Sequence, residues 1–361
     1  MKNRALIVVN STYQLLTAVN IKYKLLKERE TDILLTDVTI QLKDYIGNLK
    51  ETGVFSKVIY GKTFEMNQKY SSGNEPEISE CFQKIDSLFR WNLSEKLEKY
   101  TEVYFANYDV FVRMLACKFY EECEFIAYED GFSSYIIDYL DLGRAKINEH
   151  LEAIKIKKMV KKVLLYEPRL AVRKGGLQNI QLPKISRDDK ELIQILNYIF
   201  SYQKMNSQYK FIFLEQSFRA DGIKGNDIEL MEECRKCVER KEFIVKTHPR
   251  NRINIPFERG LSCKDIDNAP WELFLLNEDL EDKTVITICS NAALTSRIVL
   301  GIEINTVMLY ELYNGKVLWK EDLILKKYLD KFRKEFAMEK YYVPRTIYEL
   351  RNTIKFLGEQ V

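Results

Sequence analysis

The sequence is poor in the residues and patterns that usually hold metal ions, span membranes or bind nucleic acid. It contains only two histidines in 361 residues, and its formal net charge of +3 at pH 7 is small for a general nucleic-acid binder. It also lacks a run of 18 consecutive apolar residues, the length that a membrane-spanning helix needs. We therefore expect neither a membrane span nor a nucleic-acid partner.

Patterns with the spacing of metal ligands are scarce as well. The seven cysteines are scattered, and the single C-x-x-C pair, Cys234 and Cys237, has no second pair to complete a zinc site. A D-x-D pattern at Asp265 and Asp267 lacks the sheet context of a metal site. Scattered thiols are typical of a reducing compartment, and the first apolar run is too short for a signal peptide. We expect a cytoplasmic protein that holds no metal.

Short apolar runs alternate with helical patterns along the whole chain. Their lack of polar alternation is typical of parallel strands buried on both faces. Strands are expected at 5–9, 33–35, 57–60, 102–106, 124–128, 210–214, 243–246, 284–289 and 306–310. Because 361 residues exceed what one hydrophobic core usually supports, the pattern predicts an α/β protein with two Rossmann-like domains.

The domain boundaries follow from turns and charge. We expect an N-terminal domain at 1–190, a C-terminal domain at 191–330 and a helical tail at 331–361. Within the first domain, residues 144–174 carry ten basic and three acidic side chains, a balance of 10 − 3 = +7, and their apolar residues predict a basic helical segment. This segment fits a solvated helix packed on its own domain or on the partner of a homodimer, and alternatively a peripheral contact with an anionic membrane. Residues 63–76 are expected to be mostly loop, and a helix is expected at about 79–99.

A cationic turn follows the expected strand at 243–246. It contains Lys246, His248 and Pro249, and proline ends the strand because it lacks an N–H group. Ligands of α/β proteins usually bind at the carboxyl ends of the strands, so this turn is a candidate site for an anion such as phosphate. The alternative is a histidine with a purely structural role.

An acidic turn, Glu129-Asp130-Gly131, follows the expected strand at 124–128. Because neighbouring side chains at a strand end point in different directions, only one of the two carboxylates is expected to meet a reacting atom. A carboxylate in such a turn can act as a general base toward a sugar hydroxyl, and Gly131 permits a sharp bend. The alternative is an ordinary acidic loop.

Two further polar turns stand before expected helices. Ser290 and Asn291 open one helix, and Asn10, Ser11 and Thr12 open another directly after the first strand. Side-chain donors and backbone N–H groups at such a position can contact an anion or an acceptor, or they can act only as helix caps.

In combination, these motifs resemble those of the bacterial sialyltransferases. Those enzymes share an acidic-acidic-Gly motif, a His-Pro motif and a Ser-Ser/Thr motif, which stand here as Glu129-Asp130-Gly131, His248-Pro249 and Ser290-Asn291. The last departs from the pattern, because Asn291 replaces the second hydroxyl residue. The opening stretch at 9–16 looks like the start of glycosyltransferase family 52, and the related polysialyltransferases are the second resemblance.

The resemblance implies a GT-B fold, in which two Rossmann-like domains with parallel sheets face a central cleft. It implies inverting transfer of sialic acid from CMP-sialic acid to a galactose-terminated or sialic-acid-terminated surface glycan, without a metal or another cofactor. Asp130 would be the base, His248 would lie against the donor phosphate, Ser290 would bind that phosphate, and Glu272 would match the carboxylate that holds the ribose hydroxyls. Lys246, Pro249 and Asn291 belong to the same donor-binding motifs. Alternatives are another CMP-sugar or a CDP-polyol donor, or a non-catalytic glycan-assembly module.

Overall fold

The chain forms two compact units, each built around its own sheet. The computed structural model describes residues 4–138, 140, 145–173, 175–204, 209–248, 250–264, 269–317, 323–336 and 339–359. The N-terminal unit comprises Met1–Pro183 and Asp189–Ser201, and the C-terminal unit comprises Lys184–Asp188 and Tyr202–Val361. The chain therefore passes between the units more than once near residue 190.

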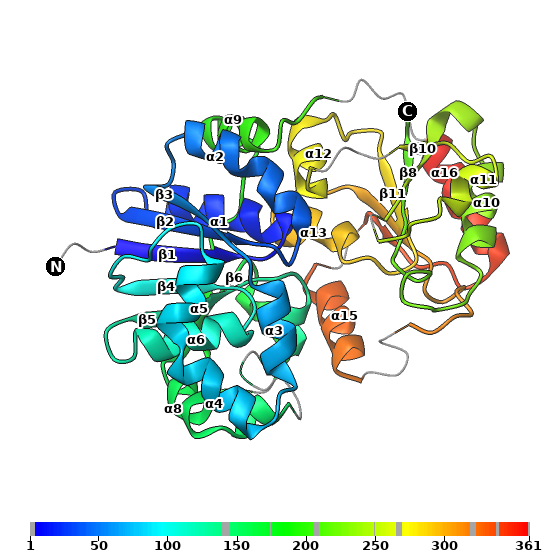
Figure 1. Ribbon diagram of the computed structural model, residues 1–361. Coiled ribbons are helices and arrows are strands. Elements are labelled where there is room, and N and C mark those ends of the chain that lie inside the picture. The colour runs from blue at the N-terminus through cyan, green and yellow to red at the C-terminus, as the bar shows by residue number, and fades with distance from the viewer. Residues whose placement is uncertain are drawn as a thin grey trace. The chain divides into compact units, whose positions relative to one another are not determined.

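The N-terminal unit contains a seven-stranded sheet in which every pairing is parallel (Figure 1). Its strands are β1 (Arg4–Val9), β2 (Glu30–Thr36), β3 (Lys57–Gly61), β4 (Glu102–Phe105), β5 (Glu124–Tyr128), β6 (Val160–Leu165) and β7 (Gln178–Gln181). The order is β3-β2-β1-β4-β5-β6-β7, so the direction of strand addition reverses between β1 and β4. Ligands of open α/β sheets usually bind at such a reversal, outside the carboxyl ends of the strands.

Helices connect these strands. They are α1 (Thr12–Lys24), α2 (Ile46–Glu51), α3 (Phe64–Ser71), α4 (Glu75–Gln83), α5 (Ile85–Asn92), α6 (Val110–Lys118), α7 (Ser133–Ile136), α8 (Leu151–Lys157) and α9 (Lys190–Ile199), with short 3₁₀ helices η1 (Ile40–Tyr45), η2 (Lys146–Glu149) and η3 (Pro168–Leu170). Helix α9 packs back on the N-terminal unit, where Asp189 forms an ion pair with Lys24 at 2.6 Å.

Between β3 and β4 the structure differs from the prediction. Residues 63–76 were expected to be loop and 79–99 a single helix, but the chain forms the three short helices α3, α4 and α5 and leaves helical structure at Leu93. Helix α4 begins with a capping box between Asn74 and Glu77, in which each side chain accepts a backbone N–H of the other residue. The polar composition of this stretch hid the three short helices, of which α4 alone starts from a side-chain cap.

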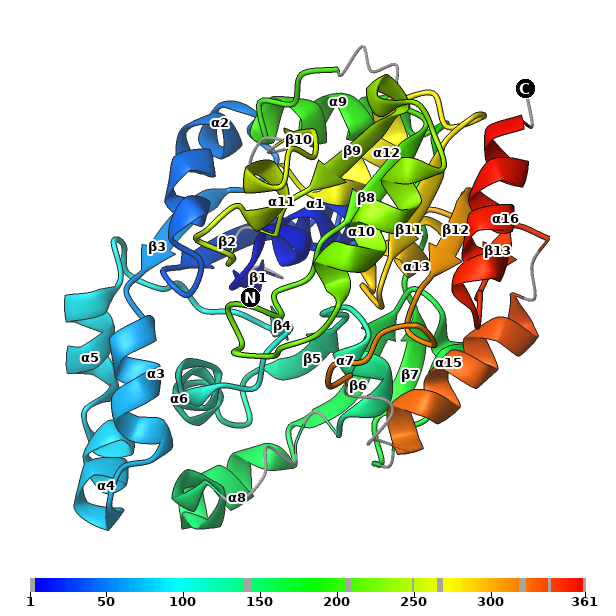
Figure 2. The ribbon, with the colours of Figure 1, turned by 90° about the vertical axis from the view of Figure 1, so that its right-hand side faces the viewer.

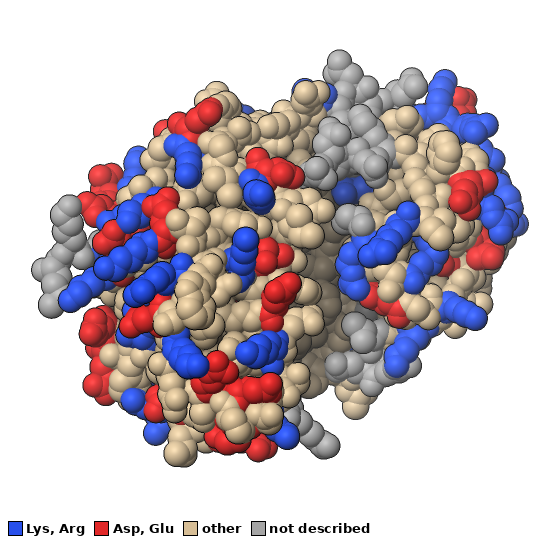
Figure 3. Space-filling model, viewed as in Figure 1, with Lys and Arg blue, Asp and Glu red and all other residues tan. Residues whose placement is uncertain are grey.

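The basic segment at 144–174 also differs from the predicted helix. Only α8 is α-helical, and the stretch that follows forms β6, an interior strand of the sheet. The apolar residues Val160, Val163 and Leu165 are buried in the sheet core, so they are not available to a membrane or a partner. In the view of Figure 3, acidic and basic side chains are interspersed over the N-terminal unit, without a large area of one sign.

The C-terminal unit contains a six-stranded sheet, again parallel at every pairing (Figure 2). Its strands are β8 (Phe211–Leu214), β9 (Phe243–Lys246), β10 (Cys263–Lys264), β11 (Thr284–Thr287), β12 (Asn305–Met308) and β13 (Tyr341–Tyr342), and its helices are α10 (Asp227–Lys236), η4 (Arg240–Glu242), α11 (Ile255–Glu258), α12 (Trp271–Asn277), α13 (Ala292–Ile298), α15 (Leu323–Glu335) and α16 (Ile347–Glu359). The order is β10-β9-β8-β11-β12-β13, with the reversal between β8 and β11. The predicted pair of parallel α/β sheets is confirmed.

The expected helical tail at 331–361 is part of this second sheet. It contains β13, which pairs with β12 so that Thr306 lies opposite Tyr341. Apolar residues of α16, including Leu350 and Ile354, are fully buried. The tail therefore completes the hydrophobic core of the C-terminal unit instead of extending from it.

Within the part of the chain that the structure describes, no helix combines the length and apolarity that crossing a membrane requires. All seven cysteines are free thiols.

Candidate functional site

In each unit, polar side chains gather at the carboxyl ends of strands on both sides of the sheet reversal, and they include residues singled out from the sequence. In the N-terminal unit they follow β1, β4 and β5, and in the C-terminal unit they follow β8, β9 and β11. Because parallel strands bring these ends to one edge of a sheet, residues far apart in sequence become neighbours there.

Asp130 is held by two neutral amides. Its carboxylate accepts hydrogen bonds from Gln14 Nε2 and from Asn107 Nδ2, both at 2.9 Å. Gly131 has a φ of +68°, a left-handed conformation that suits glycine, and the backbone N–H of Asp130 donates to Ser134 Oγ at 2.7 Å. Burial raises the pKa of Asp130, and the two amide donors oppose this rise. The carboxylate is therefore oriented by groups that leave its negative charge unneutralised.

Glu129 has a different environment. It is only 1% exposed, and its carboxylate accepts hydrogen bonds from Tyr13 Oη at 2.9 Å, from the backbone N–H of Tyr166 at 2.8 Å and from Tyr135 Oη. Burial raises its pKa to about 7, although these hydrogen bonds lower it. Glu129 thus fixes the turn from inside the domain, whereas Asp130 lines a cavity.

A network of amides links the turns after β1 and β4. Gln14 Nε2 also donates to Asn107 Oδ1 at 2.7 Å, and Asn10 Nδ2 donates to Asn107 Oδ1 at 3.1 Å and to Asp109 Oδ2 at 3.2 Å. Asn10 in turn accepts a hydrogen bond from Thr36 Oγ1 at 2.8 Å. The orientation of the Asp130 carboxylate therefore depends on residues from three strand ends.

The other two residues of the first polar turn act on helix α1. Ser11 is its N-cap, with a side chain that accepts the Gln14 backbone N–H at 3.2 Å, and Thr12 is its first residue. This cap sets the start of the helix that carries Gln14 toward Asp130. Ser11 also lines the cavity.

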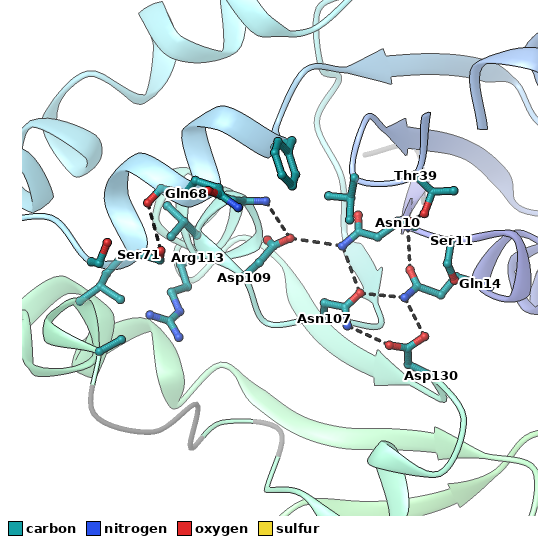
Figure 4. Close-up of a pocket in the computed structure, with 17 residues that line it drawn as sticks. Asn10, Ser11, Gln14, Thr39, Gln68, Ser71, Asn107, Asp109, Arg113 and Asp130 are labelled. Carbon is teal, nitrogen blue, oxygen red and sulfur yellow. Dashed lines mark hydrogen bonds between the residues drawn. The ribbon is translucent and has the colours of Figure 1, made fainter. Parts of the chain in front are cut away.

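The cavity at this edge has a volume of about 810 Å³ and lies within the N-terminal unit (Figure 4). It is lined by residues from the turns after β1, β2, β4 and β5, from helices α1, α3 and α6 and from the start of η2: Asn10, Ser11, Gln14, Val38, Thr39, Phe64, Asn67, Gln68, Ser71, Ser72, Asn107, Asp109, Val110, Arg113, Asp130, Ala145 and Ile147. Its volume and its many hydroxyl and amide groups suit a sugar.

In the C-terminal unit, His248 follows β9. Its Nδ1 accepts the backbone N–H of Arg250 at 3.2 Å, which leaves Nε2 as the ring nitrogen available to a ligand. Burial, followed by the positive charges of Arg250 and Lys246, lowers the pKa of His248 against the opposing influence of Glu215. These influences favour the neutral form of His248, and an added negative charge beside the ring would favour the protonated form.

Two residues after β8 connect the neighbouring turns. Glu215 Oε2 accepts the backbone N–H of His248 at 2.7 Å. Gln216 Oε1 accepts the backbone N–H of Cys289 at 2.7 Å, and its carbonyl accepts Asn251 Nδ2 at 2.8 Å. Because β8 lies between β9 and β11, these bonds fix the His248 turn on one side and the turn before Ser290 on the other.

Ser290 and Asn291 stand before α13 but form a weak cap. Ser290 Oγ accepts the Ala292 backbone N–H at 3.3 Å, and Asn291 makes no side-chain capping bond. The Asn291 Oδ1 atom is buried without a hydrogen-bond partner among the described residues. These two side chains thus retain hydrogen-bonding capacity.

Glu272 lies in the first turn of α12 and is 4% exposed. Burial raises its pKa, and a hydrogen bond from Thr295 and the charge of Lys246 oppose this rise. Pro249, Asp265 and Asp267 lie outside the described residues.

Several residues of these two clusters were missed in the sequence. Asn107, Asp109 and Glu215 directly follow strands that were predicted, so the strand-end rule was enough to find them. Gln14 and Arg113 lie inside helices among apolar residues, and no local signal marks them. Across the described residues, no group of three or more His, Cys, Asp or Glu side chains is arranged to hold a metal ion.

Comparisons with known proteins give a family and a fold. The family model described as alpha-2,8-polysialyltransferase matches residues 5–309. A search of curated protein sequences finds no match. Of the two resemblances drawn from the motifs, the match supports the polysialyltransferases, and the likeness to glycosyltransferase family 52 stays a prediction.

Solved structures share the architecture at low sequence identity. Arabidopsis thaliana UGT89C1 complexed with UDP aligns with a TM-score of 0.53 and 9% identity, over 100% of this chain and 91% of that chain. The complex of UGT89C1 with UDP-L-rhamnose aligns with a TM-score of 0.55 and 8% identity, with the same coverage of 100% and 91%. The α/β fold with two parallel sheets is thus that of the GT-B glycosyltransferases, as predicted. Since the family match runs from β1 to the end of β12, the chain belongs to the alpha-2,8-polysialyltransferase family.

Proposed function

We propose that this protein is an inverting sialyltransferase that uses CMP-sialic acid and extends a sialic-acid-terminated surface glycan. The observation that carries the proposal is the Asp130 carboxylate, held at 2.9 Å by each of two neutral amides and lining a cavity of about 810 Å³. The description of the matching family, alpha-2,8-polysialyltransferase, supports both the sialic acid acceptor and an α2,8 linkage.

Asp130 acts as the general base in this proposal. The acceptor hydroxyl attacks the anomeric carbon of the donor and gives its proton to the Asp130 carboxylate, while the bond from that carbon to the phosphate oxygen breaks. The bonding electrons leave with CMP, and the configuration at the anomeric carbon inverts. A carboxylate whose pKa is raised by burial is a stronger base than an exposed one, and Gln14 and Asn107 keep it in one orientation.

The C-terminal cluster holds the donor in this proposal. Lys246 and Ser290 interact with the phosphate, and Glu272 accepts hydrogen bonds from the ribose hydroxyls. The negative charge that develops on departing CMP raises the pKa of His248, which burial and nearby cations lower in the free protein. His248 donates its Nε2–H group to the leaving phosphate, and the second proton, taken from solvent at Nδ1, replaces the hydrogen bond accepted from the Arg250 backbone.

Product analysis tests the function directly. The protein is incubated with CMP-sialic acid and an acceptor panel that contains lactose, a sialylated lactose and a short α2,8-linked sialic acid oligomer. We expect CMP release together with an elongated product, with the highest rate for the oligomer. Absence of product from every acceptor, or product only with another CMP-sugar or a CDP-polyol, would contradict the proposal.

A further inference from the structure

Arg113 is a buried cation on the wall of the Asp130 cavity. It belongs to helix α6, is 3% exposed, and lines the cavity together with Asp109 and Asp130. Its guanidinium lies over the ring of Tyr108 at 5.1 Å from the centroid. Figure 4 shows Arg113 and Asp130 toward opposite ends of the lining, with Asn107 and Asp109 drawn between them.

The guanidinium has donors without acceptors. Its Nε and Nη1 atoms are both buried and find no hydrogen-bond partner among the described residues, and no described carboxylate forms an ion pair with it. Each of these N–H groups is shielded from bulk solvent and unpaired among the described residues, which is unfavourable for any polar group and more so for a charged one.

The neighbouring carboxylate of Asp109 is already occupied. It accepts the backbone N–H of Val112 at 2.9 Å, Asn67 Nδ2 at 3.1 Å and Asn10 Nδ2 at 3.2 Å. The charge of Asp109 raises the pKa of Arg113, but the Asp109 carboxylate accepts no hydrogen bond from the Arg113 guanidinium. Among the described residues, the positive charge of Arg113 therefore has no direct counter-ion where α6 lines the cavity.

A buried, unpaired guanidinium is costly unless an anion completes it. The planar fork of arginine matches the two oxygens of a carboxylate, and its charge persists at every physiological pH, although burial lowers the pKa of Arg113. Other lining groups suit the remainder of a sugar, because Ser71 and Ser72 carry hydroxyls and Phe64 presents an aromatic side chain that is 45% exposed. The cavity thus combines a carboxylate site with groups for a polyhydroxylated ring.

We propose that Arg113 binds the carboxylate of the acceptor's terminal sugar and makes the cavity selective for acidic acceptors. This inference rests on the proposed function, in which Asp130 accepts a proton from that same sugar. The donor sugar of a sialyl transfer also carries a carboxylate. The acceptor is favoured because its hydroxyl must reach Asp130, which lines the same cavity as Arg113.

A binding experiment without donor tests the site independently of transfer. The unfolding midpoint is measured with the methyl glycoside of sialic acid and with the methyl ester of that compound, which has the same shape but no charge. The acid is expected to raise the midpoint of the wild-type protein more than the ester does. Equal shifts, or no shift by the acid at saturating concentration, overturn the proposal whether or not the protein transfers sialic acid.

The matched variants are Arg113→Gln and Arg90→Gln, the latter an exposed arginine on α5. Arg113→Gln is expected to abolish the difference between acid and ester, and Arg90→Gln to retain it. Because the wild-type comparison stands alone, a poorly folded Arg113→Gln protein leaves the proposal testable.

Kinetics separate the two sources of carboxylate. Loss of a charged hydrogen bond predicts that Arg113→Gln raises the KM for a sialic-acid-terminated acceptor by about 10-fold to 100-fold, with the KM for CMP-sialic acid unchanged. Lysine at this position restores charge without the fork, so Arg113→Lys is expected to recover part of the loss. An increase confined to the KM for CMP-sialic acid would assign Arg113 to the donor and overturn the proposal. Absence of any transfer by the wild-type protein, with the acid and ester still distinguished, would contradict the proposed function and leave the carboxylate site standing.

Discussion

The adjacent carboxylates of Glu129 and Asp130 show how burial gives neighbouring residues different chemistry. Glu129 is enclosed by Tyr13, Tyr135 and the Tyr166 backbone, and its pKa rises to about 7. The Asp130 carboxylate accepts hydrogen bonds from two neutral amides and lines the cavity. The sequence predicted that one of the two would meet a reacting atom, and of the two only Asp130 lines the described cavity, so its role as the base stays a proposal.

The raised pKa of Glu129 predicts a dependence of stability on pH. Its ordinary value is 4.5 and its value in the folded protein is about 7, so the proton is bound more tightly in the folded state. The resulting stability is fully present below about pH 4.5 and is lost as the pH rises through 7, and its size is on the order of 3 kcal/mol. Glu129→Gln, which preserves the shape, is expected to flatten the fall of the unfolding midpoint between pH 5 and about 8. An unchanged slope in the variant would contradict the assignment of this titration to Glu129.

The proposed role of Asp130 as base predicts that its substitution lowers kcat and leaves the binding of CMP unchanged. Asp130→Asn is expected to lower kcat by roughly 100-fold to 10,000-fold, the usual contribution of general base catalysis. The stabilisation of the protein by CMP is expected to persist, since the proposed donor residues belong to the C-terminal unit. Asp44→Asn, which changes an exposed carboxylate of the same unit, is the control and is expected to leave kcat unchanged. A variant at position 130 with normal turnover would remove Asp130 from the mechanism.

At the scale of elements, the turn from β1 into α1 positions the candidate base. Gln14 lies in the first turn of α1 and donates from one Nε2 atom to both Asn107 and Asp130, while its Oε1 accepts the Asn10 backbone N–H at 2.7 Å. Gln14 is therefore a positioning residue, because it acts on the carboxylate and not on the reacting atoms.

Removal of this donor predicts a shift of the pH profile. The hydrogen bond from Gln14 lowers the pKa of Asp130, so Gln14→Met is expected to raise that pKa and move the acid limb of kcat/KM to higher pH. A base must be deprotonated, so activity is lost as the pH falls through the raised pKa. The exposed Gln41→Met is the matched control and is expected to keep the wild-type profile. If kcat/KM of Gln14→Met falls equally at every pH and its acid limb does not move, the substitution has caused a structural defect and Gln14 does not set the pKa of Asp130.

The sequence predicted those elements whose local pattern carries their structure. Strands β5 and β9 each contain an unbroken apolar run, and both were found together with the candidate turns that follow them. Strand β7, with the sequence QNIQ, has no such run because it lies at the edge of the sheet, where its side chains are mostly exposed. The helix predicted at 144–174 was wrong because the apolar residues of α8 and β6, taken together, have the spacing of one long helix. Arg113 could not be identified from the sequence, because only the tertiary fold decides that a charged residue in α6 is buried beside a cavity.

At the scale of the whole molecule, the two units share one sheet topology and one placement of polar residues. Each sheet is parallel and reverses its strand order once, and each places its polar cluster at that reversal. The clusters differ in chemistry. Carboxylates and amides predominate in the N-terminal unit, whereas a histidine with nearby cations lies in the C-terminal unit. This division fits an acceptor that must lose a proton and a donor that must leave with a negative charge.

The division of roles predicts which nucleotide stabilises the protein and through which residues. CMP is expected to raise the unfolding midpoint more than UMP, CDP or UDP, with a stabilisation of about 2.7 kcal/mol at a concentration 100 times its Kd. Because bound phosphate raises the pKa of His248, the affinity for CMP is expected to fall as the pH rises through that pKa. His248→Ala is expected to reduce the shift and its pH dependence, whereas Asp130→Asn is expected to retain both. A larger shift with UDP would contradict a CMP-sugar donor, and a pH-independent shift in the wild-type protein would show that His248 stays neutral beside the phosphate.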